Sequence, residues 1–545
     1  MSVTLARSLA RRVRDRPELV ASVAAVAGAL VATRLVLLWR FPPFLDESLY
    51  AGWALQVHDS FAARWVALLN GKLPLLSWLG AGVMHGGFAP LTAVRLVSIV
   101  AAVVSAVFAA LIAGEIAGRQ AAIAAAAVYV ILPLALVHDV LGLMEPLVTA
   151  FFAASFYLQA RLARRPSFVT AAILGLVFAA ALLTKETSYL LLVLFPCSLV
   201  LFDWRAPERL RRLGHWAIAA VLSCCLAARA ELWLGSSGKM SVYRTTQQGF
   251  GTFRSLQTGL AHPIRWADQA WPGYRPEILG YLTWPLAFLA LVGAIVSVWR
   301  RQRLALLCAL WILAVFAIDV LFLTDSFVRY LVPAGPFVAV LVAVGFAEMV
   351  QLARRVPRIA PHAVVAAALV LVAVSAVAVR FDLSVLADPN TAAYAGVSLQ
   401  EYETGWSAGT GVESLTAELR RLGRSHTAVV TWYGHLPLEL ILELRHDASV
   451  ELVSTDDHSS YVVTNDLPLP ANAGLGTLRP LKTFQRPRNG VPLVLYERGV
   501  VWKGRFYTTA ESLRKGLGLD DRHFDTFIAQ HPRIHAWYTA VTSGS

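Results

Sequence analysis

Long apolar runs, separated by short arginine-rich segments, dominate the first 380 residues of this 545-residue chain. The runs are continuous, as in residues 21–39 (ASVAAVAGALVATRLVLLW) and 101–113 (AAVVSAVFAALIA). A run of about 20 apolar residues matches the hydrocarbon thickness of a bilayer. The pattern therefore predicts a multi-pass α-helical membrane protein with about eleven transmembrane helices. The predicted spans are residues 19–39, 91–113, 120–137, 147–162, 168–184, 186–202, 214–234, 279–299, 304–323, 331–350 and 362–380.

The pattern changes from about residue 381 onward, where apolar runs become short and are bounded by turn residues. Strands interleaved with stretches of helical spacing indicate a small α/β domain. We therefore expect a membrane domain over 1–380 and a C-terminal soluble α/β domain over 381–545. The predicted strands are 427–433, 449–454, 461–465 and 491–497, and the predicted helices are 411–422 and 436–445.

Composition supports the membrane assignment, because 57% of the residues are hydrophobic and only 15% are charged. Soluble domains carry about 25% charged residues. The net charge of +13 comes from arginines in short loops. This pattern follows the positive-inside rule and does not indicate a nucleic-acid partner. It predicts a cell-membrane protein with a cytoplasmic N-terminus and a C-terminal domain outside.

The first apolar run follows an arginine-rich start but is too long for a signal peptide, so we expect a retained helix. The four cysteines lie inside apolar runs, which predicts neither a disulfide framework nor a zinc site. No cofactor is expected, although a divalent cation that joins Asp46 and Glu145 stays open. Asp456, Asp457 and His458 are expected to form a turn, and the glycine-rich stretch 405–411 lacks the context of a phosphate loop.

Three acidic residues on the predicted outer side are candidates for chemistry. Asp46 and Glu47 follow Pro42-Pro43, just after the first span. A carboxylate pair at a membrane surface can act as a general base or bind a cation, and a solvated acidic turn is the simpler alternative. Glu145 opens the fourth span, where an acid is costly unless it faces water or a partner. A favourable charge at a helix N-terminus is the simpler explanation for Glu145, and an ordinary loop is the simpler one for His138 and Asp139.

Three cations on the outer side oppose the bias that defines the topology. Lys72 precedes an aromatic amphipathic segment, Lys185 lies in a tight turn, and Arg329-Tyr330 opens the tenth span. Such cations can hold a phosphate at headgroup depth. Each can also be an ordinary interface anchor that contacts lipid headgroups.

Taken in order, these residues lie in segments that resemble those of the GT-C glycosyltransferases. The resemblance is to bacterial members related to protein O-mannosyltransferases and to the aminoarabinose transferase of lipid A. Leu73 departs from a proline of the family, Glu145 from an aspartate and Glu186 from a glycine. The similar segments are FLDESLYAGWA, GKLPLLSWL, LMEPLVTAFF, LLTKETSYLL, RYLVPAGPF and, at the start of the tail, EYETGWSAGTGVESLTAEL.

This resemblance implies a polyprenyl-phosphate-linked sugar as the donor and transfer on the outer face. The acceptor would be a protein, a lipid or a glycan. Lys72 and Arg329 would stabilise the leaving phosphate, together with Lys185 and Tyr330. Asp46 would take the proton of the acceptor hydroxyl, and Glu47 or Glu145 would orient the base or the sugar.

Two other classes of function remain open at this level. A membrane transporter or lipid flippase would also place acids and bases on the outer side. Transporters show inverted repeats and midplane charges, and the sequence offers no repeat and only Arg34 and Asp319 near span ends. A non-catalytic scaffold of an envelope complex is the other alternative, because the chain departs from the family at Leu73 and Glu186.

Overall fold

The computed structural model describes residues 17–542, apart from 252, 359, 425–426, 434–437, 454–458 and 466–476. Its contacts divide the chain into two compact units. The first, here the helical unit, comprises Met1–Phe41 and Tyr50–Ser398. The second comprises Pro42–Leu49 and Leu399–Ser545 and is here called the outer unit, after the side of the membrane that the arginine bias predicts for it.

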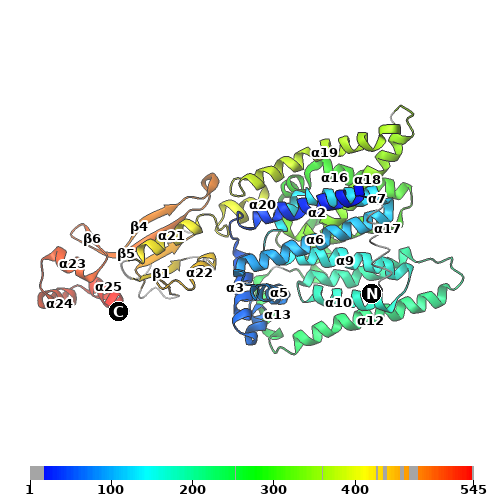
Figure 1. Cartoon of the computed structure of the whole chain (residues 1–545). Coiled ribbons are helices and arrows are strands. Elements are labelled where there is room, and N and C mark those ends of the chain that lie inside the picture. The colour runs from blue at the N-terminus through cyan, green and yellow to red at the C-terminus, as the bar shows by residue number, and fades with distance from the viewer. Residues whose placement is uncertain are drawn as a thin grey trace. The chain divides into compact units, whose positions relative to one another are not determined.

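The longest helices of the helical unit run side by side (Figure 1). They follow the long apolar runs, because a helix satisfies all backbone polar groups internally where no water is present. These helices are α2 (Pro17–Leu38), α6 (Pro90–Ala117), α9 (Met144–Arg164), α12 (Arg209–Gly235), α16 (Trp284–Trp299), α17 (Arg303–Phe322), α18 (Gly335–Arg354) and α19 (Ala363–Ala387).

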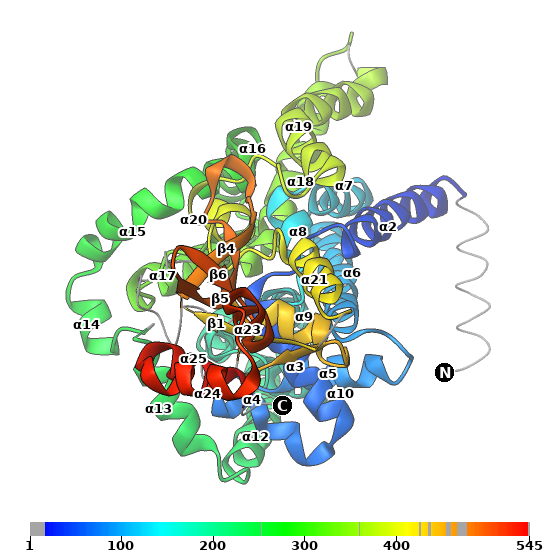
Figure 2. The same cartoon turned by 90° about the vertical axis from the view of Figure 1, so that its left-hand side faces the viewer.

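Shorter helices connect the long ones. In Figure 2, α14 and α15 lie at the edge of the helical unit. The shorter elements are α3 (Leu45–Asp59), η1 (Phe61–Trp65), α4 (Val66–Leu69), α5 (Leu75–Met84), α7 (Arg119–Val130), α8 (Pro133–His138), α10 (Phe168–Leu182), η2 (Glu186–Ser188), α11 (Tyr189–Leu194), η3 (Phe195–Leu201), α13 (Met240–Phe250), α14 (Leu256–Ala261), α15 (Pro263–Ile278), η4 (Leu279–Thr283), η5 (Val328–Ala334) and η6 (Ala360–His362).

The predicted multi-pass membrane architecture is confirmed. Within the described residues, seven helices are long and apolar enough to cross a membrane. Four shorter apolar helices accompany them, and three of these fall on predicted spans. The predicted span 120–137 is interrupted, because Pro133 ends one helix and begins another. The seven are Ala21–Leu38, Pro90–Ala117, Arg209–Gly235, Pro263–Trp299, Arg303–Phe322, Val328–Arg354 and Ala360–Ala387.

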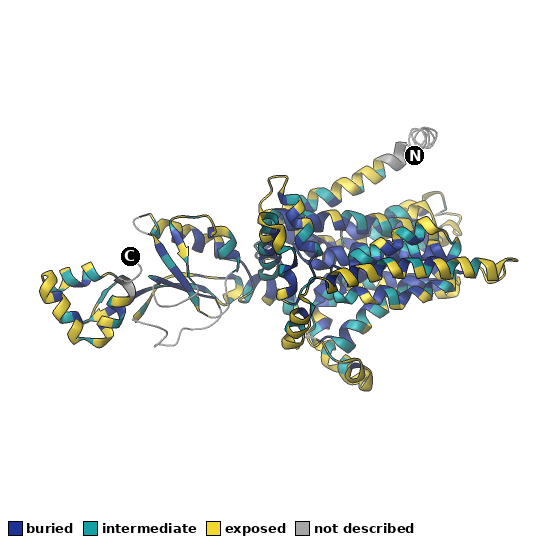
Figure 3. Ribbon diagram, turned by 90° about the horizontal axis from the view of Figure 1, so that it is seen from below, coloured by how far each residue is buried: buried dark blue, intermediate teal, exposed yellow. Residues whose placement is uncertain are grey.

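Helix α18 forms the centre of the helical unit. The apolar window of Val328–Arg354 is 94% buried, whereas that of Ala360–Ala387 is only 22% buried. Figure 3 shows exposed residues along the outward faces of the helices. Gly293 of α16 packs against α18 so closely that a side chain there would meet the carbonyl oxygen of Leu341. Small residues at helix contacts allow such close packing in membranes, where burial of apolar surface drives little association.

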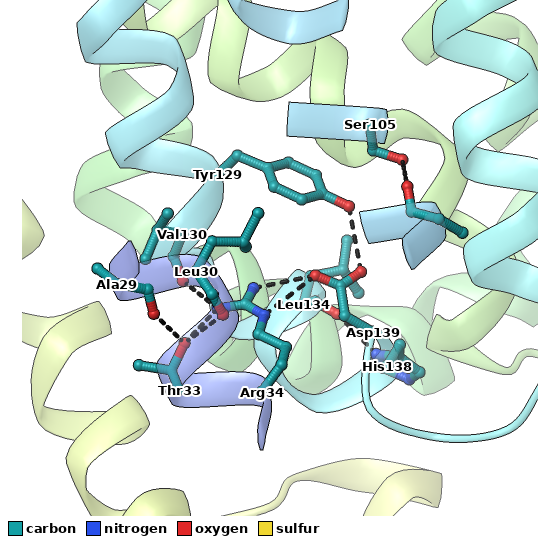
Figure 4. A network of polar contacts seen from close by, with 11 residues as sticks. Ala29, Leu30, Thr33, Arg34, Ser105, Tyr129, Val130, Leu134, His138 and Asp139 are labelled. Carbon is teal, nitrogen blue, oxygen red and sulfur yellow. Dashed lines mark hydrogen bonds and ion pairs between the residues drawn. The ribbon is translucent and has the colours of Figure 1, made fainter. Parts of the chain in front are cut away.

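A fully buried ion pair lies in the helical unit, between α2 and the segment after α8 (Figure 4). Arg34 donates from Nη2 to Asp139 Oδ2 at 3.0 Å, and both side chains are 0% exposed. The Tyr129 hydroxyl donates to Asp139 Oδ1 at 3.1 Å. Arg34 Nη1 also donates to the carbonyl of Val130 at 2.8 Å. Asp139 is therefore a structural partner of Arg34. It compensates the charge that Arg34 carries near the end of a predicted span.

The outer unit is an α/β domain, as predicted. Its sheet has the strand order β2-β1-β3-β5-β4, and β6 pairs with β5. Strand β1 runs parallel to β2 and β3, and the remaining pairs are antiparallel. Helices α21 and α22 contribute Leu415, Leu419 and Leu440 to its main core. The strands are β1 (Ala428–Tyr433), β2 (Val450–Leu452), β3 (Tyr461–Thr464), β4 (Thr477–Phe484), β5 (Leu493–Trp502) and β6 (Arg505–Tyr507).

Several strands and helices of the outer unit were not predicted from the sequence. Strand β4 was missed because its sequence, TLRPLKTF, contains proline and two cations. It lies at the sheet edge, and its pairing shifts between Pro480 and Lys482, which is where a strand tolerates proline. Three C-terminal helices form a second core with Trp537 and Phe524. The helices of this unit are α20 (Gly396–Leu399, shared with the helical unit), η7 (Gln400–Thr404), α21 (Val412–Leu422), α22 (Leu438–Leu444), η8 (Pro487–Asn489), α23 (Ala510–Leu517), α24 (Asp521–Gln530) and α25 (Pro532–Thr542).

Replacing Asp139 by asparagine preserves its shape but leaves the buried Arg34 guanidinium without a counter-charge. We expect Asp139→Asn to lower the free energy of unfolding by about 3–5 kcal/mol, the usual cost of breaking a buried pair. Thermal unfolding in detergent measures the loss. The double variant Arg34→Met with Asp139→Leu should regain most of the stability, because no charge remains buried. Equal stability of Asp139→Asn and the natural protein would contradict a structural role for the pair.

Candidate functional site

Glu145, Lys185 and Tyr330 meet within the helical unit although they come from three separate segments. Glu145 lies in the first turn of α9, Lys185 in the turn after α10, and Tyr330 in η5. Lys185 Nζ donates to Glu145 Oε1 at 2.7 Å. The same ammonium lies 4.1 Å from the centroid of the Tyr330 ring. The three predicted site residues therefore form one contact cluster.

Arg329 adds a second cation to this cluster. Its guanidinium carbon lies 4.8 Å from the centroid of the Phe327 ring and 5.6 Å from that of Tyr330. Arg329 is only 8% exposed and interacts electrostatically with both Glu145 and Lys185. Two cations therefore lie together in this part of the helical unit, and cations of this kind can hold an anion through charge-assisted hydrogen bonds.

Lys72 lies on the segment next to the Lys185 turn. The backbone N–H of Leu75 donates to the carbonyl of Leu183 at 3.0 Å, which joins the two segments. Lys72 itself is half-buried, and its Nζ lies 5.7 Å from the ring centroid of Phe250. No described carboxylate pairs with Lys72, unlike Lys185. Its charge is therefore available to a ligand.

Both departures from the family pattern in this region are explained by contact with α13. Leu73 is buried in an apolar cluster with Leu183 and with Tyr243 of α13. Glu186 accepts hydrogen bonds from the Tyr243 hydroxyl and from Gln247 Nε2. Gln247 also donates to the carbonyl of Gly71. Helix α13 thus holds the segment of Lys72 and the segment of Lys185 together.

Asp46 and Glu47 occupy the first turn of α3, which belongs to the outer unit by its contacts. Glu47 is fully buried, and its Oε2 accepts from the backbone N–H of Phe44 at 3.0 Å. This contact is the carboxylate half of a capping box, in which the third helical residue bonds back to the N-cap. Asp46 is half-buried, one helical turn before Tyr50. The pair therefore combines a capping residue with a more accessible carboxylate.

The entry to α3 is held by an arginine that the sequence did not single out. Arg95 of α6 is buried, and its Nη1 donates to the carbonyls of Leu38 and Phe41 at 2.7 and 3.0 Å.

Asp319 of α17 is a second residue near the site to which the sequence assigns no role beyond a charge near a span end. It is 3% exposed and interacts electrostatically with Lys185 and Glu145, and its Oδ2 accepts no hydrogen bond from the described residues. The position of Asp319 inside an apolar run could have identified it from the sequence, because an acid in a membrane span is costly and is usually kept for a function.

No three His, Cys, Asp or Glu side chains gather as a possible metal site in the part of the chain that the structure describes. Asp456, Asp457 and His458, predicted to form a turn, lie outside the described residues. The glycine-rich stretch 405–411 follows η7 and leads into α21.

Comparisons with known proteins bear on this arrangement. Residues 72–233 match the family model described as dolichyl-phosphate-mannose-protein mannosyltransferase. The fold is similar to that of ArnT from Cupriavidus metallidurans in the apo state, with a TM-score of 0.56 and 15% identity over 89% of this chain and 98% of that one. The chain has the fold of the GT-C glycosyltransferases. The resemblance inferred from the short sequence segments is thereby confirmed.

Two further structures share this GT-C fold. ArnT bound to undecaprenyl phosphate gives a TM-score of 0.55 at 14% identity, over 88% of this chain and 98% of that one. The archaeal oligosaccharyltransferase AglB from Archaeoglobus fulgidus, in complex with an inhibitory peptide and a dolichol-phosphate, gives 0.51 at 12% identity, over 83% and 69%. No curated protein matches the chain in sequence. The matched family segment includes Lys72, Glu145 and Lys185 and ends before Arg329.

Removal of the Glu186 carboxylate tests whether α13 is held as described. We expect Glu186→Ala to lower the free energy of unfolding by about 1–3 kcal/mol, because two donors lose a charged acceptor. Both donors use the same oxygen, Oε1, so the amide oxygen of Glu186→Gln can keep both bonds. The glutamine variant should therefore retain most of the stability in thermal unfolding. An alanine variant as stable as the natural protein would show that α13 is held in another way.

Proposed function

We propose that the protein is a membrane glycosyltransferase that moves a sugar from a polyprenyl-phosphate donor to an acceptor on the outer face of the membrane. The observation that carries the proposal is the group formed by Glu145, Lys185, Arg329 and Tyr330, in which two cations lie together. Further support comes from the GT-C fold and from the lipid phosphates named in two similar structures.

The donor's leaving group is a phosphate that is already an anion. Its departure needs positive charge placed in advance and no general acid. Arg329 and Lys72 are proposed to bind this phosphate, because a lipid phosphate can accept charge-assisted bonds from both. Lys185 is paired with Glu145, so it contributes charge while Glu145 keeps it in place. The ring of Tyr330 lies on the Lys185 ammonium and limits its movement.

In the proposed step, the acceptor hydroxyl oxygen attacks the anomeric carbon of the sugar. The bond between that carbon and the phosphate oxygen breaks, and polyprenyl phosphate leaves with the bonding electrons. The acceptor proton passes to a carboxylate, for which Asp46 is the candidate. Glu47 already caps α3 and is proposed to hold the helix that carries Asp46. The step needs no further reactant.

The outer unit is proposed to bind the acceptor, because it follows the last span and contributes the first turn of α3. We place this unit outside the cell membrane and the N-terminus in the cytoplasm, in accord with the arginine bias of the loops.

Transfer of radiolabelled sugar from a lipid-phosphate donor to envelope acceptors tests the proposal directly. Purified protein in proteoliposomes should produce labelled acceptor and release polyprenyl phosphate in equal amounts. Movement of the labelled lipid across the bilayer without cleavage would instead support a flippase. Neither transfer nor movement with a panel of donors would favour a scaffold.

Asp46→Asn should reduce turnover by about 100-fold or more, because it removes the base but keeps the shape of the side chain. Binding of the donor should change little. The matched control is Asp59→Asn, which makes the same change at the exposed last residue of the same helix. If Asp46→Asn retains normal turnover while the control behaves as expected, the base is a different residue.

Lys72→Ala and Arg329→Ala should each weaken binding of polyprenyl phosphate by about 1.5–3 kcal/mol, the range for a hydrogen bond to a charged group. The double variant should lose less than the sum, because both side chains act on one phosphate. The measurement is a titration of polyprenyl phosphate and of uncharged polyprenol against each variant.

The control is Arg64→Ala, since Arg64 lies 4.7 Å from the Phe61 ring centroid as an interface anchor would. It should leave the preference for the phosphate over the polyprenol unchanged. An unchanged preference in Lys72→Ala, Arg329→Ala and the double variant would remove both residues from the proposed site.

A further inference from the structure

A buried glutamate outside the cluster holds the segment that carries Arg329. Glu277, near the end of α15, is 0% exposed. Its Oε2 accepts from the backbone N–H of Val328 at 2.9 Å. Val328 is the first residue of η5 and directly precedes Arg329. The first N–H groups of a helix have no partner within the helix, so this carboxylate caps the start of η5 from a distant part of the chain.

The other oxygen of the same carboxylate binds a second segment. Glu277 Oε1 accepts from the backbone N–H of Ser398 at 2.8 Å and from its hydroxyl at 3.2 Å. Gly396 packs so closely that a Cβ there would lie 2.6 Å from the Cγ of Glu277. Ser398 is the last residue of the helical unit, and the outer unit resumes at Leu399. One carboxylate therefore joins η5 to the segment that leads into the outer unit.

A carboxylate is chemically required by this arrangement. Both of its oxygens accept from backbone N–H groups, and an ionised carboxylate is an acceptor only. A glutamine offers one oxygen and one NH₂ group, so either orientation of its amide would turn a donor toward a donor. Glu277 also forms no ion pair with any described residue, although an uncompensated acid is costly in an apolar environment. Its three hydrogen bonds offset that cost.

We propose that Glu277 is a positioning residue of the donor-phosphate site. It holds the backbone at Val328 so that Arg329 faces the phosphate, and it ties this backbone to the segment before the outer unit. The inference rests on the proposed function, because it assigns the purpose of the contact to lipid-phosphate binding. It adds a residue that touches neither the phosphate nor the sugar.

The test compares Glu277→Gln with Glu348→Gln in the full-length protein. Glu348 is a matched control, because it is a buried glutamate of the helical unit that pairs with Arg300 at 2.8 Å and lies on α18 more than three helical turns beyond the end of η5. Glu277→Gln should raise the Kd for polyprenyl phosphate by about 5- to 10-fold, which is less than the loss from removing a hydrogen bond to a charged group, because Arg329 itself is still present. Glu348→Gln should leave this Kd unchanged, even where both variants lose similar thermal stability.

A double-variant cycle separates positioning from a general loss of structure. If Glu277 acts through Arg329, the variant Glu277→Gln with Arg329→Ala should bind polyprenyl phosphate no more weakly than Arg329→Ala alone. Additive losses, or a Kd for Glu277→Gln equal to that of the natural protein, would overturn the inference. If Glu277→Gln does not fold, Ser398→Ala removes one of the three bonds and should raise the Kd about twofold. An unchanged Kd in that variant would likewise overturn the inference.

The same titration distinguishes failure of the proposed function from failure of the role proposed for Glu277. Failure of the natural protein to bind polyprenyl phosphate or to transfer sugar would reject the proposed function itself. Normal binding by the natural protein together with normal binding by Glu277→Gln would reject only the role of Glu277.

Discussion

A charge that is buried among apolar helices is costly unless it is compensated, and the contacts that compensate such charges hold segments of the helical unit together. Removing a charge from water costs several kcal/mol unless a partner and hydrogen bonds replace the water. Arg34 meets the requirement with Asp139, and Lys185 with Glu145. Glu277 meets it with two backbone N–H groups and the hydroxyl of Ser398. These contacts join segments far apart in the sequence, so compensation of charge also helps to determine which segments of the helical unit meet.

The candidate site departs from the family pattern without losing its cations. Leu73 and Glu186 both contact α13, a helix of the long loop between α12 and α16. Tyr243 contacts both residues. Its side chain packs against Leu73, and its hydroxyl donates a hydrogen bond to the carboxylate of Glu186. These substitutions are therefore parts of one local arrangement.

The sequence was sufficient to predict the membrane architecture, because long apolar runs have few structural alternatives in a bilayer. It also placed Glu145, Lys185, Arg329 and Tyr330 in one candidate set, and these residues meet in the structure. The sequence could not predict contacts made through backbone groups, because every residue carries these groups whatever its side chain. Glu277 lies before an apolar run just as Glu145 does, yet its partners are N–H groups at Val328 and Ser398. Strand β4 was missed for a related reason, since edge position and a shift in pairing allowed a proline that its sequence pattern excludes.

The central claim is that the outer cluster of the helical unit binds a lipid phosphate. A density map of the protein with bound polyprenyl phosphate tests it most directly. The account predicts phosphate density within hydrogen-bonding distance of Arg329 and Lys72, near the start of α9. A second basic location, a cavity of about 460 Å³ lined by Arg161, Arg164 and Arg165, lies at the other end of the same helix, about 30 Å away. Phosphate density in that cavity, with none beside Arg329, would contradict the account.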